Sequence, residues 1–269
     1  MRQLQVLVAT MHQKDFSLAE RMNLRCDAVI ANQTDTCRVE EAQRPYGTLK
    51  MLSTDTAGVG LNRNIALGAA DADLLLFADD DVTYFNDMPE QVTRAFAAHP
   101  DADVIVFGLD QTKAGAVFRR IRPPEGWLHV WNSMRFGTCV LAARRASLLR
   151  CGIHFHTLFG GGCLYSAGED SLFLKSCFDS GLRVYGHRYV LGTCSKDQSS
   201  WFTGCNEKYF YDKGALMACL FPRCSRLMVL RFALIFKRET ELSALQRLQW
   251  MERGRRGFRT LKPYSGGNA

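Results

Sequence analysis

The chain has 269 residues, of which 47% are apolar and 23% charged, and this composition excludes wholesale disorder. Its length suits one large domain with an appendage, and a chain this long folds without a disulfide or metal staple. The net charge is +7, but residues 223–262 hold 11 Lys or Arg and 3 Asp or Glu, a local net of +8. We therefore expect the C-terminal segment to contact an anionic surface.

Short apolar runs alternate with helix-forming runs in the first half of the chain. Buried strands are expected at 5–9, 27–31, 73–78 and 103–107, with a weaker strand at 48–52. Helices are expected at 15–23, 60–70 and 89–98. This alternation predicts an α/β domain with a mostly parallel sheet flanked by helices.

The second half of the chain is less regular. We expect strands at 137–142 and 183–189, helices at 144–150 and 169–180, and a glycine-rich loop at 159–168. From residue 223 onward the pattern is helical. The chain is therefore expected to divide into a main domain at 1–222 and a basic helical C-terminal extension at 223–269.

The cysteines and the N-terminal residues favour a cytoplasmic protein. None of the ten cysteines belongs to a CxxC pair, so no zinc knuckle is expected. The first residues lack the apolar core of a signal peptide, so the thiols are expected to be reduced. No apolar run reaches ~18 residues, the length that a membrane-spanning helix requires. We expect a cytoplasmic protein, at most peripheral on the inner face of the cell membrane.

Three consecutive carboxylates, Asp79, Asp80 and Asp81, follow the apolar strand at 73–78. Such groups repel one another unless they are solvated or neutralised by a cation. Hard oxygen ligands at the carboxyl end of a strand suit Mg²⁺ or Mn²⁺ that holds a diphosphate. The triplet alone fits equally well an acidic turn that binds nothing.

A second pair of acids, Glu169 and Asp170, follows Gly168 and opens a helix. A carboxylate at this position often serves only as a cap or a partner of the helix dipole. It can also act as a general base that takes the proton of an attacking sugar hydroxyl. The preceding glycine-rich loop would let the backbone approach a bulky acceptor.

These pieces occur in a specific order: VLVAT at 6–10, GVGLNRNIALGAA at 58–70, LLLFADDDV at 74–82 and LFGGGCLYSAGEDSLFLKSCFDSGLRV at 158–184. With this order the chain resembles the family 2 glycosyltransferases of the GT-A fold. The resemblance covers about residues 1–220. The segment 201–222 is also similar to the tail of some bacterial members that build surface polysaccharides.

The resemblance implies a role for each matching residue. Asp81 would bind the divalent metal, Asp79 would contact the ribose or the metal through water, and Asp170 would be the base of an inverting, single-displacement transfer. The nucleotide-sugar side is further expected to include Thr10, Asn32, Asp35, Arg63, Asn64 and Asp80. The acceptor side is expected to include Gly161, Gly162, Glu169 and Trp201.

The chain departs from the family pattern at two places: at the residues that usually recognise the nucleotide base of the donor, and at the residue that usually completes the metal site. Residues 9–11 read Ala-Thr-Met where the family usually has Pro-x-Tyr, and residues 32–35 read Asn-Gln-Thr-Asp where acidic residues are usual. The family often has a late histidine near the metal, but here His187 is expected to be structural. His154 and His156 have metal-like spacing and are expected to be a loop pair.

We therefore expect transfer of a sugar from a nucleotide-diphosphate donor, with a UDP-sugar as first choice. The expected acceptor is a hydroxyl of a glycan or lipid-linked molecule in surface polysaccharide synthesis, and the expected cofactor is Mn²⁺ or Mg²⁺. An anionic membrane is an expected partner of the extension. Nucleic acid is not, because the basic segment lacks interleaved aromatic residues.

Two other classes of protein stay open. A sugar nucleotidyltransferase could use the same sheet and carboxylates, although it usually has a basic glycine-rich loop directly after the first strand. The chain has ATMHQKD at that place, without glycine. A non-catalytic binding protein with the same fold is the second alternative.

Overall fold

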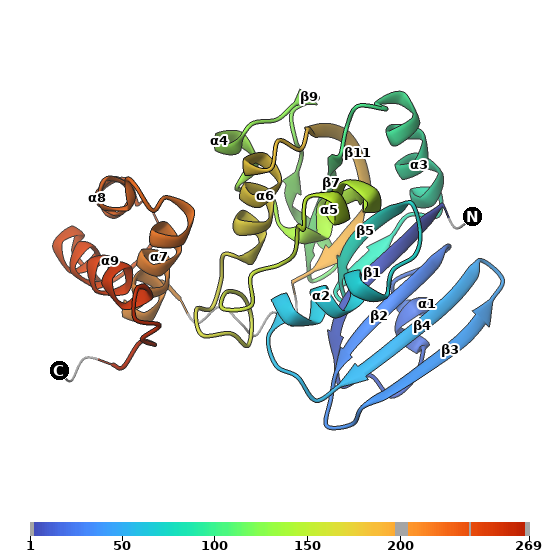
Figure 1. Cartoon of the computed structure of the whole chain (residues 1–269), viewed down its shortest axis with the longest axis horizontal. Helices are drawn as coiled ribbons and strands as arrows, with labels where there is room; N and C mark the ends of the chain where they lie inside the picture. Colours follow the sequence, from blue (N-terminus) through green and yellow to red (C-terminus); the bar gives the residue numbers. More distant parts are fainter. Residues whose placement is uncertain (1–2, 197–203, 237, 267–269) are drawn as a thin grey trace.

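The computed structural model describes residues 3–196, 204–236 and 238–266. It has a central sheet flanked by helices, and the C-terminal helices gather to one side of it (Figure 1). This architecture agrees with the α/β class predicted from the alternating strands and helices.

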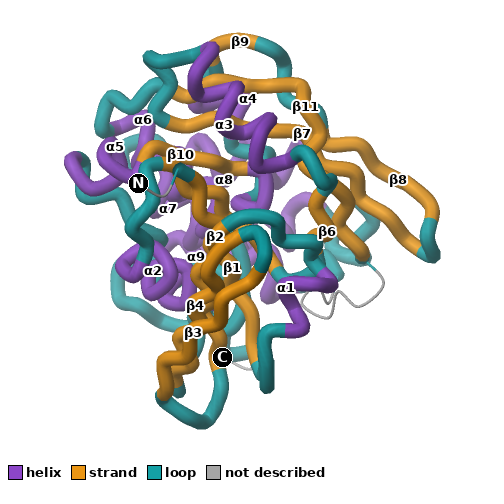
Figure 2. Tube along the Cα trace, turned by 90° about the vertical axis from the view of Figure 1, so that its right-hand side faces the viewer, coloured by secondary structure: helices purple, strands orange, loops and turns teal. Residues whose placement is uncertain are grey.

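The strands of the described residues form one mixed sheet. Their bounds are β1 Leu4–Met11, β2 Asp27–Gln33, β3 Arg38–Arg44, β4 Gly47–Thr54, β5 Leu74–Asp79, β6 Val82–Tyr84, β7 Val104–Lys113, β8 Ala116–Ile121, β9 Gly126–Trp127, β10 Leu141–Arg144 and β11 Val184–Ser195. The spatial order is β3-β4-β2-β1-β5-β10-β7-β11-β6, with β8 paired to β7 and β9 to β11. Figure 2 shows the β7–β8 hairpin reaching away from the rest of the sheet.

The core of this sheet is parallel. β4, β2, β1 and β5 run parallel to one another, and β7 runs parallel to β11. β10 lies between β5 and β7 and is antiparallel to both, and β3 is antiparallel to β4. The central strands β1, β2 and β5 are almost entirely buried, as strands covered on both faces require, whereas β4 alternates buried and partly exposed residues.

The helices predicted between residues 15 and 180 are confirmed, with ends that move by one or two residues. The helices are α1 Ser17–Arg21, α2 Val59–Ala69, α3 Met88–Ala98, α4 Val130–Ser133, α5 Arg145–Arg150, α6 Glu169–Asp179, α7 Glu207–Leu220, α8 Ser225–Ile235 and α9 Ala244–Phe258. The strand expected at 137–142 is wrong in its first half, because Thr138–Val140 forms a 3₁₀ turn and β10 begins at Leu141.

The register of the parallel strands brings polar residues to one edge of the sheet. Within β5, Leu76 and Phe77 are fully buried. At the strand ends, Ala9 pairs with Asp79, and Thr10 pairs with Asn32. The apolar stretches therefore build the core, and the first polar residues after them meet at the carboxyl edge, where open α/β sheets bind ligands.

The C-terminal helices pack closely on one another. A Cβ at Gly214 of α7 would lie 1.9 Å from the carbonyl oxygen of Met251, and a Cβ at Gly254 of α9 would lie 1.8 Å from that of Tyr211. Glycine at both positions lets α7 and α9 approach at backbone distance. The helical cluster thus includes α7, which precedes the boundary expected near residue 222. None of the described helices is long and apolar enough to cross a membrane.

Candidate active site

The start of α2 is fastened to the carboxyl edge of the sheet by Asn62. Its Nδ2 donates to the carbonyl oxygens of Thr10 and Ala31, at 3.0 and 2.9 Å, and the residue is almost fully buried. These two acceptors end β1 and β2. Because Asn62 bridges both strands, the next residue, Arg63, is held beside the acids that follow β5.

The three acids after β5 have different partners. Asp79 accepts from Arg63, Asp80 accepts from the Thr10 hydroxyl at 2.5 Å, and Asp81 forms an ion pair with Lys196 at 2.8 Å. Desolvation, together with the charges of Asp79 and Asp81, raises the pKa of Asp80. The Oδ1 atom of Asp81 is buried and has no hydrogen-bond partner among the described residues. The cluster therefore keeps an oxygen that a bound cation could use.

Arg63 connects the two acidic groups. Its guanidinium lies 2.6 Å from Asp79, 3.1 Å from Glu169 and 3.5 Å from Asp170, measured between nitrogen and oxygen. Only 4% of the residue is exposed. Burial opposes its charge, but the three carboxylates outweigh burial and raise the pKa of Arg63. A planar fork with several donors is suited to bridging carboxylates in this way.

Asp170 is placed at the first turn of α6 with a partner that the sequence did not reveal. The backbone N–H of Thr138 donates to its Oδ1 at 3.2 Å, and the Thr138 hydroxyl donates to the same atom. Desolvation and the charge of Glu169 raise the pKa of Asp170 to about 7, although Arg63 and the Thr138 hydroxyl act in the opposite direction. A carboxylate with such a pKa is suited to accept a proton near neutral pH.

The glycine-rich loop folds against the start of α2. The carbonyl oxygen of Gly161 accepts from the N–H of Val59 at 2.9 Å. A Cβ at Gly160 would lie 2.9 Å from Cδ of Glu169, and Gly162 has a φ of 75°. The glycines thus let the loop pass between α2 and the Glu169 side chain. Of the two glycines expected on the acceptor side, Gly162 is exposed and lies beside Gly58, and Gly161 is partly buried.

The other residues expected on the donor side lie in different surroundings. Asn32 is fully buried and bonds to the backbone of Gln13 and to Ser53. Asn64 exchanges two hydrogen bonds with the backbone of Phe155. Asp35 is exposed. Trp201 lies outside the described residues.

Asn32 and Asn64 therefore use their amide groups in hydrogen bonds to other residues of the chain. The residues that do come together at the sheet edge are Thr10, Arg63, Asp79, Asp80 and Asp81.

Two lysines near the acids were not predicted. Lys196 follows β11 and pairs with Asp81, and the charges of that pair outweigh burial and raise the pKa of Lys196. Lys213 of α7 lies within electrostatic range of Glu169 and Asp170, but burial dominates and lowers its pKa. It forms no ion pair within the described part of the chain. Neither lysine stands in a sequence pattern that would mark it, since only the fold brings α7 and the end of β11 to the acids.

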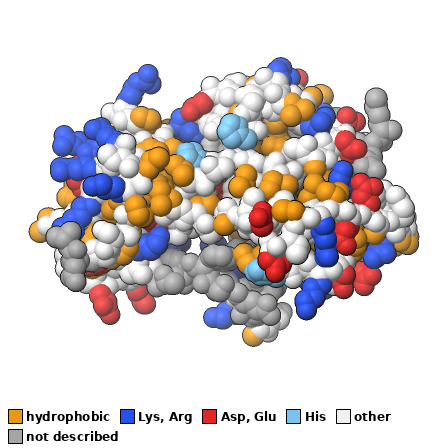
Figure 3. All heavy atoms as spheres, turned by 60° about the horizontal axis from the view of Figure 1, so that its bottom comes forward, with side chains coloured by type: hydrophobic (Ala, Val, Ile, Leu, Met, Phe, Trp, Pro, Cys, Tyr) orange, Lys and Arg blue, Asp and Glu red, His pale blue; other side chains and the backbone are white. Residues whose placement is uncertain are grey.

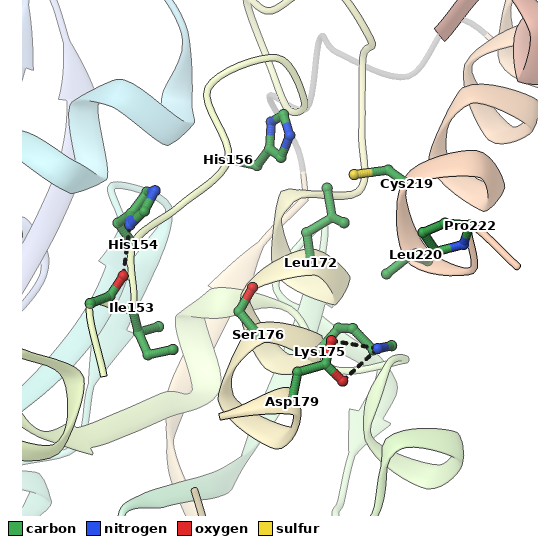
Figure 4. Close-up of a pocket in the computed structure, with 11 residues that line it drawn as sticks. Ile153, His154, His156, Leu172, Lys175, Ser176, Asp179, Cys219, Leu220 and Pro222 are labelled. Atoms are coloured by element: carbon green, nitrogen blue, oxygen red, sulfur yellow. Dashed lines mark hydrogen bonds and ion pairs between the residues drawn. The ribbon is translucent and has the colours of Figure 1, made fainter. Parts of the chain in front are cut away.

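The histidines have structural surroundings. His187 packs against Phe107, with ring centroids 5.5 Å apart, and burial lowers its pKa. His154 and His156 border a cavity of about 270 Å³ between the segment after α5, α6 and the end of α7 (Figure 4). Among the described residues that border this cavity, Asp179 has the one carboxylate, and it is paired with Lys175 at 2.6 Å. Within the described residues, no group of three His, Cys, Asp or Glu side chains could hold a metal ion.

Comparison with solved structures identifies the architecture. The structure of S. aureus TarS residues 1–349 in complex with UDP-GlcNAc aligns with a TM-score of 0.60 and 17% identity, covering 96% of this chain and 73% of that one. The same protein in complex with UDP gives 0.59 and 16%, covering 96% and 72%. The chain has the GT-A fold.

A further TarS structure aligns with a TM-score of 0.55 and 15% identity, covering 95% of this chain and 43% of that one. No protein-family model matches the sequence, and no curated protein matches it. At such low identity the likeness shows the fold, including the presence of C-terminal helices. The chemistry has to be argued from the site itself.

Proposed function

We propose that the chain is an inverting glycosyltransferase, which moves a sugar from a nucleotide-diphosphate donor to a hydroxyl of a glycan or lipid-linked acceptor. The observation that carries this proposal is the bridge made by Arg63. It joins the acids of the strand edge to Glu169 and Asp170, with nitrogen–oxygen distances of 2.6 to 3.5 Å. A charge-binding edge and a proton-accepting carboxylate thus lie side by side, as transfer from a diphosphate leaving group requires.

The donor side is the carboxyl edge of the sheet. Thr10, Arg63 and the acids after β5 lie there, and the TarS structures of the same fold are complexes with UDP-GlcNAc and UDP. We infer a UDP-sugar as the donor. Asn32 lies near the end of β2 and Asp35 follows the strand by two residues, so the nucleotide base would be read by the exposed Asp35 and by backbone groups rather than by the buried Asn32 amide.

Mn²⁺ or Mg²⁺ fits the donor set of this edge. Asp79 and Asp81 offer hard carboxylate oxygens, and one oxygen of Asp81 is buried without a partner among the described residues. The cation would be held by these two acids, with the remaining positions left for diphosphate and water. When bound, it would neutralise the charge that develops on the leaving diphosphate.

Asp170 serves as the base. The acceptor hydroxyl gives its proton to Asp170, and its oxygen attacks the anomeric carbon from the face opposite the leaving diphosphate. Glu169 already accepts from Arg63 and from the N–H of Gly168, so it holds Arg63 and the loop in place rather than taking the proton. One displacement without a covalent intermediate inverts the configuration at the anomeric carbon. Lys213 would stabilise the negative charge around Asp170 and Glu169.

The acceptor is proposed to be a growing surface polysaccharide or its lipid-linked precursor at the inner face of the cell membrane. The glycine-rich loop, with Gly161 and the exposed Gly162, offers backbone without bulky side chains, and its Gly160 lies next to Glu169. Trp201 would contribute to the same side. The basic C-terminal extension supports a location close to anionic lipid.

A donor panel tests this function. Thermal unfolding is followed with UDP-, GDP- and dTDP-sugars, each with and without Mn²⁺, and release of the nucleoside diphosphate is then measured. We expect a UDP-sugar to raise the unfolding temperature most and to release UDP slowly without an acceptor. Release of pyrophosphate from a nucleoside triphosphate and a sugar 1-phosphate would instead indicate a nucleotidyltransferase. Donor binding without any turnover that depends on Asp170 would indicate a binding protein.

A further inference from the structure

The outward face of α8 is apolar. Leu227, Leu230 and Leu234 are spaced by three and four residues, so they lie on one side of the helix. Their exposed fractions are 64%, 42% and 62%. The opposite side carries Val229 and Ala233, which are buried in a small core together with residues of α7 and α9. The helix is therefore fully packed on one side and still presents leucines to solvent on the other.

Arginines border this leucine stripe. At 100° per residue, Arg226 lies at one edge of the stripe and Arg231 at the other, and both are exposed. Neither forms an ion pair within the described ranges. The sequence from 223 to 238 contains no Asp or Glu. Figure 3 shows Lys and Arg side chains gathered around hydrophobic ones at the left end of the molecule, where the C-terminal helices lie.

We propose that this face of α8 binds the surface of an anionic membrane. The helix lies in the plane of the interface, with Leu227, Leu230 and Leu234 among the upper acyl carbons and Arg226 and Arg231 at the lipid phosphates. Interfacial helices combine an exposed apolar face with basic residues in this way. Each arginine near anionic lipid adds to binding, and the apolar stripe adds an attraction that salt does not screen.

A lipid surface fits this face better than a second copy of the chain. Two copies meeting through α8 would bring four arginines together, and α8 itself has no acidic residue to pair with them, since the next acids, Glu239 and Glu241, lie beyond its C-terminal end. The phosphates of anionic lipid supply the missing negative charge. This proposal does not depend on the glycosyl transfer proposed above, since it concerns binding to vesicles that contain no sugar donor.

The β7–β8 hairpin provides a matched control. It exposes Phe118 to 57% and carries the exposed Arg119 and Arg120, so it too combines an aromatic residue with two arginines. Reversing Arg119 and Arg120 to Glu changes the net charge by the same amount as reversing Arg226 and Arg231. The pair of variants therefore separates a specific face of α8 from the overall positive charge.

The test is co-sedimentation of the full chain with vesicles of phosphatidylcholine that contain about 30% of the anionic lipid phosphatidylglycerol. We expect binding that weakens as salt is raised. Arg226→Glu with Arg231→Glu should lower the partition coefficient by at least about thirtyfold, since each lost basic residue costs about fivefold and anionic lipid also repels the two new carboxylates. Leu227→Gln with Leu234→Gln should remove the binding that persists at high salt.

Two controls complete the test. Arg119→Glu with Arg120→Glu, and Leu149→Gln with Val39→Gln, should bind as the parent chain does, because these residues are exposed elsewhere. Equal binding to vesicles of pure phosphatidylcholine would overturn the proposal. So would an equal loss in the hairpin variant, or unchanged binding in the α8 variants. A change from dimer to monomer in the leucine variant, without vesicle binding by the parent, would assign the face to a second copy instead.

Discussion

The two acidic groups of the site are built on different elements and present their charges differently. Asp79 and Asp81 follow a strand and keep 37% and 31% of their side chains exposed. At the helix start Glu169 keeps 11% of its side chain exposed and Asp170 keeps 33%, and desolvation together with the charge of Glu169 raises the pKa of Asp170 to about 7. The strand edge therefore offers carboxylates to a ligand, whereas the surroundings at the helix start raise the pKa of a carboxylate into the range useful for proton transfer.

Arg63 makes these two groups depend on each other. It is one buried cation that contacts three carboxylates, and Lys213 lies within electrostatic range of Glu169 and Asp170. A nucleotide-sugar donor with its cation would add positive charge beside Asp79, and its diphosphate would also interact with Arg63. Binding at the strand edge should therefore change the pKa of Asp170. Substitutions in either acidic group can test whether the two groups have separate roles.

The largest expected effect belongs to the strand edge. Asp81→Asn should abolish transfer with the fold intact, because it removes one ligand of a diphosphate-bound cation. Activity is measured with saturating UDP-sugar and Mn²⁺, and circular dichroism checks the fold. Asp179→Asn serves as control, since Asp179 pairs with Lys175 outside the site. Undiminished activity in the mutant, or in the parent with excess EDTA, would show that the acids do not act through a cation.

The next effect belongs to the helix start. Asp170→Asn should lower turnover by ~10²–10⁴-fold and leave donor affinity nearly unchanged, as expected for a positioned base. Thermal stability should not fall, because the substitution removes a charge that burial disfavours. Donor affinity by calorimetry and turnover by UDP release are the two measurements. A parallel collapse of both would make Asp170 a binding or structural residue.

The sequence predicted the parts of the molecule that repeat a strong local pattern. The continuously apolar strands ending in Thr10, Asn32 and Asp79 were recognisable, because burial on both faces dictates their composition. The strands β3 and β8 were missed, since both are largely exposed and carry polar or charged residues. An edge strand needs no apolar run, so its sequence gives little signal.

The site was predictable where its residues stand next to a pattern, and not where only the fold brings them in. Asp79 and Asp170 follow a strand and open a helix, and both positions are visible in the sequence. Thr138 reaches Asp170, and Lys196 reaches Asp81, from distant segments, and neither residue belongs to a motif. Asn62 was next to the recognised Arg63, yet its role in tying α2 to two strands depends on backbone carbonyls that no pattern reveals.

A smaller effect, on stability, comes from breaking the bridge. Arg63→Met should lower the free energy of unfolding by about 3 kcal/mol, because it leaves the largely buried Glu169 and the partly exposed Asp79 and Asp170 without a counter-charge. Arg63→Lys should recover only part of this, since an ammonium cannot reproduce the fork. The control Arg122→Met breaks a more exposed pair with Asp110 and should cost about 1 kcal/mol or less.

Urea denaturation of these variants gives the comparison. The double variant Arg63→Met with Asp170→Asn should be more stable than Arg63→Met alone, because it removes one of the carboxylates left unpaired. If Arg63→Met costs no more than Arg122→Met, then Arg63 is not the electrostatic link between the two groups.

The smallest expected effect is a shift of the pH profile. Asp170 must be deprotonated to accept a proton, so kcat/KM should fall as pH drops below about 7. The Thr138 hydroxyl stabilises the ionised form and lowers the pKa of Asp170. Thr138→Val removes this hydroxyl and should therefore raise that pKa, moving the acid limb of the profile upward by about one unit.

Above the shifted limb, the Thr138→Val variant should regain most of the parent activity, because the base is then ionised again. Thr138→Ser keeps the hydroxyl and should leave the profile in place. Thr138→Val also distinguishes the two acidic groups, because within the described chain Thr138 donates hydrogen bonds to Asp170 and to no acid of the strand edge. A profile that moves to lower pH, or a uniform loss of activity at every pH, would mean that Thr138 orients the helix start without adjusting the proton affinity of Asp170.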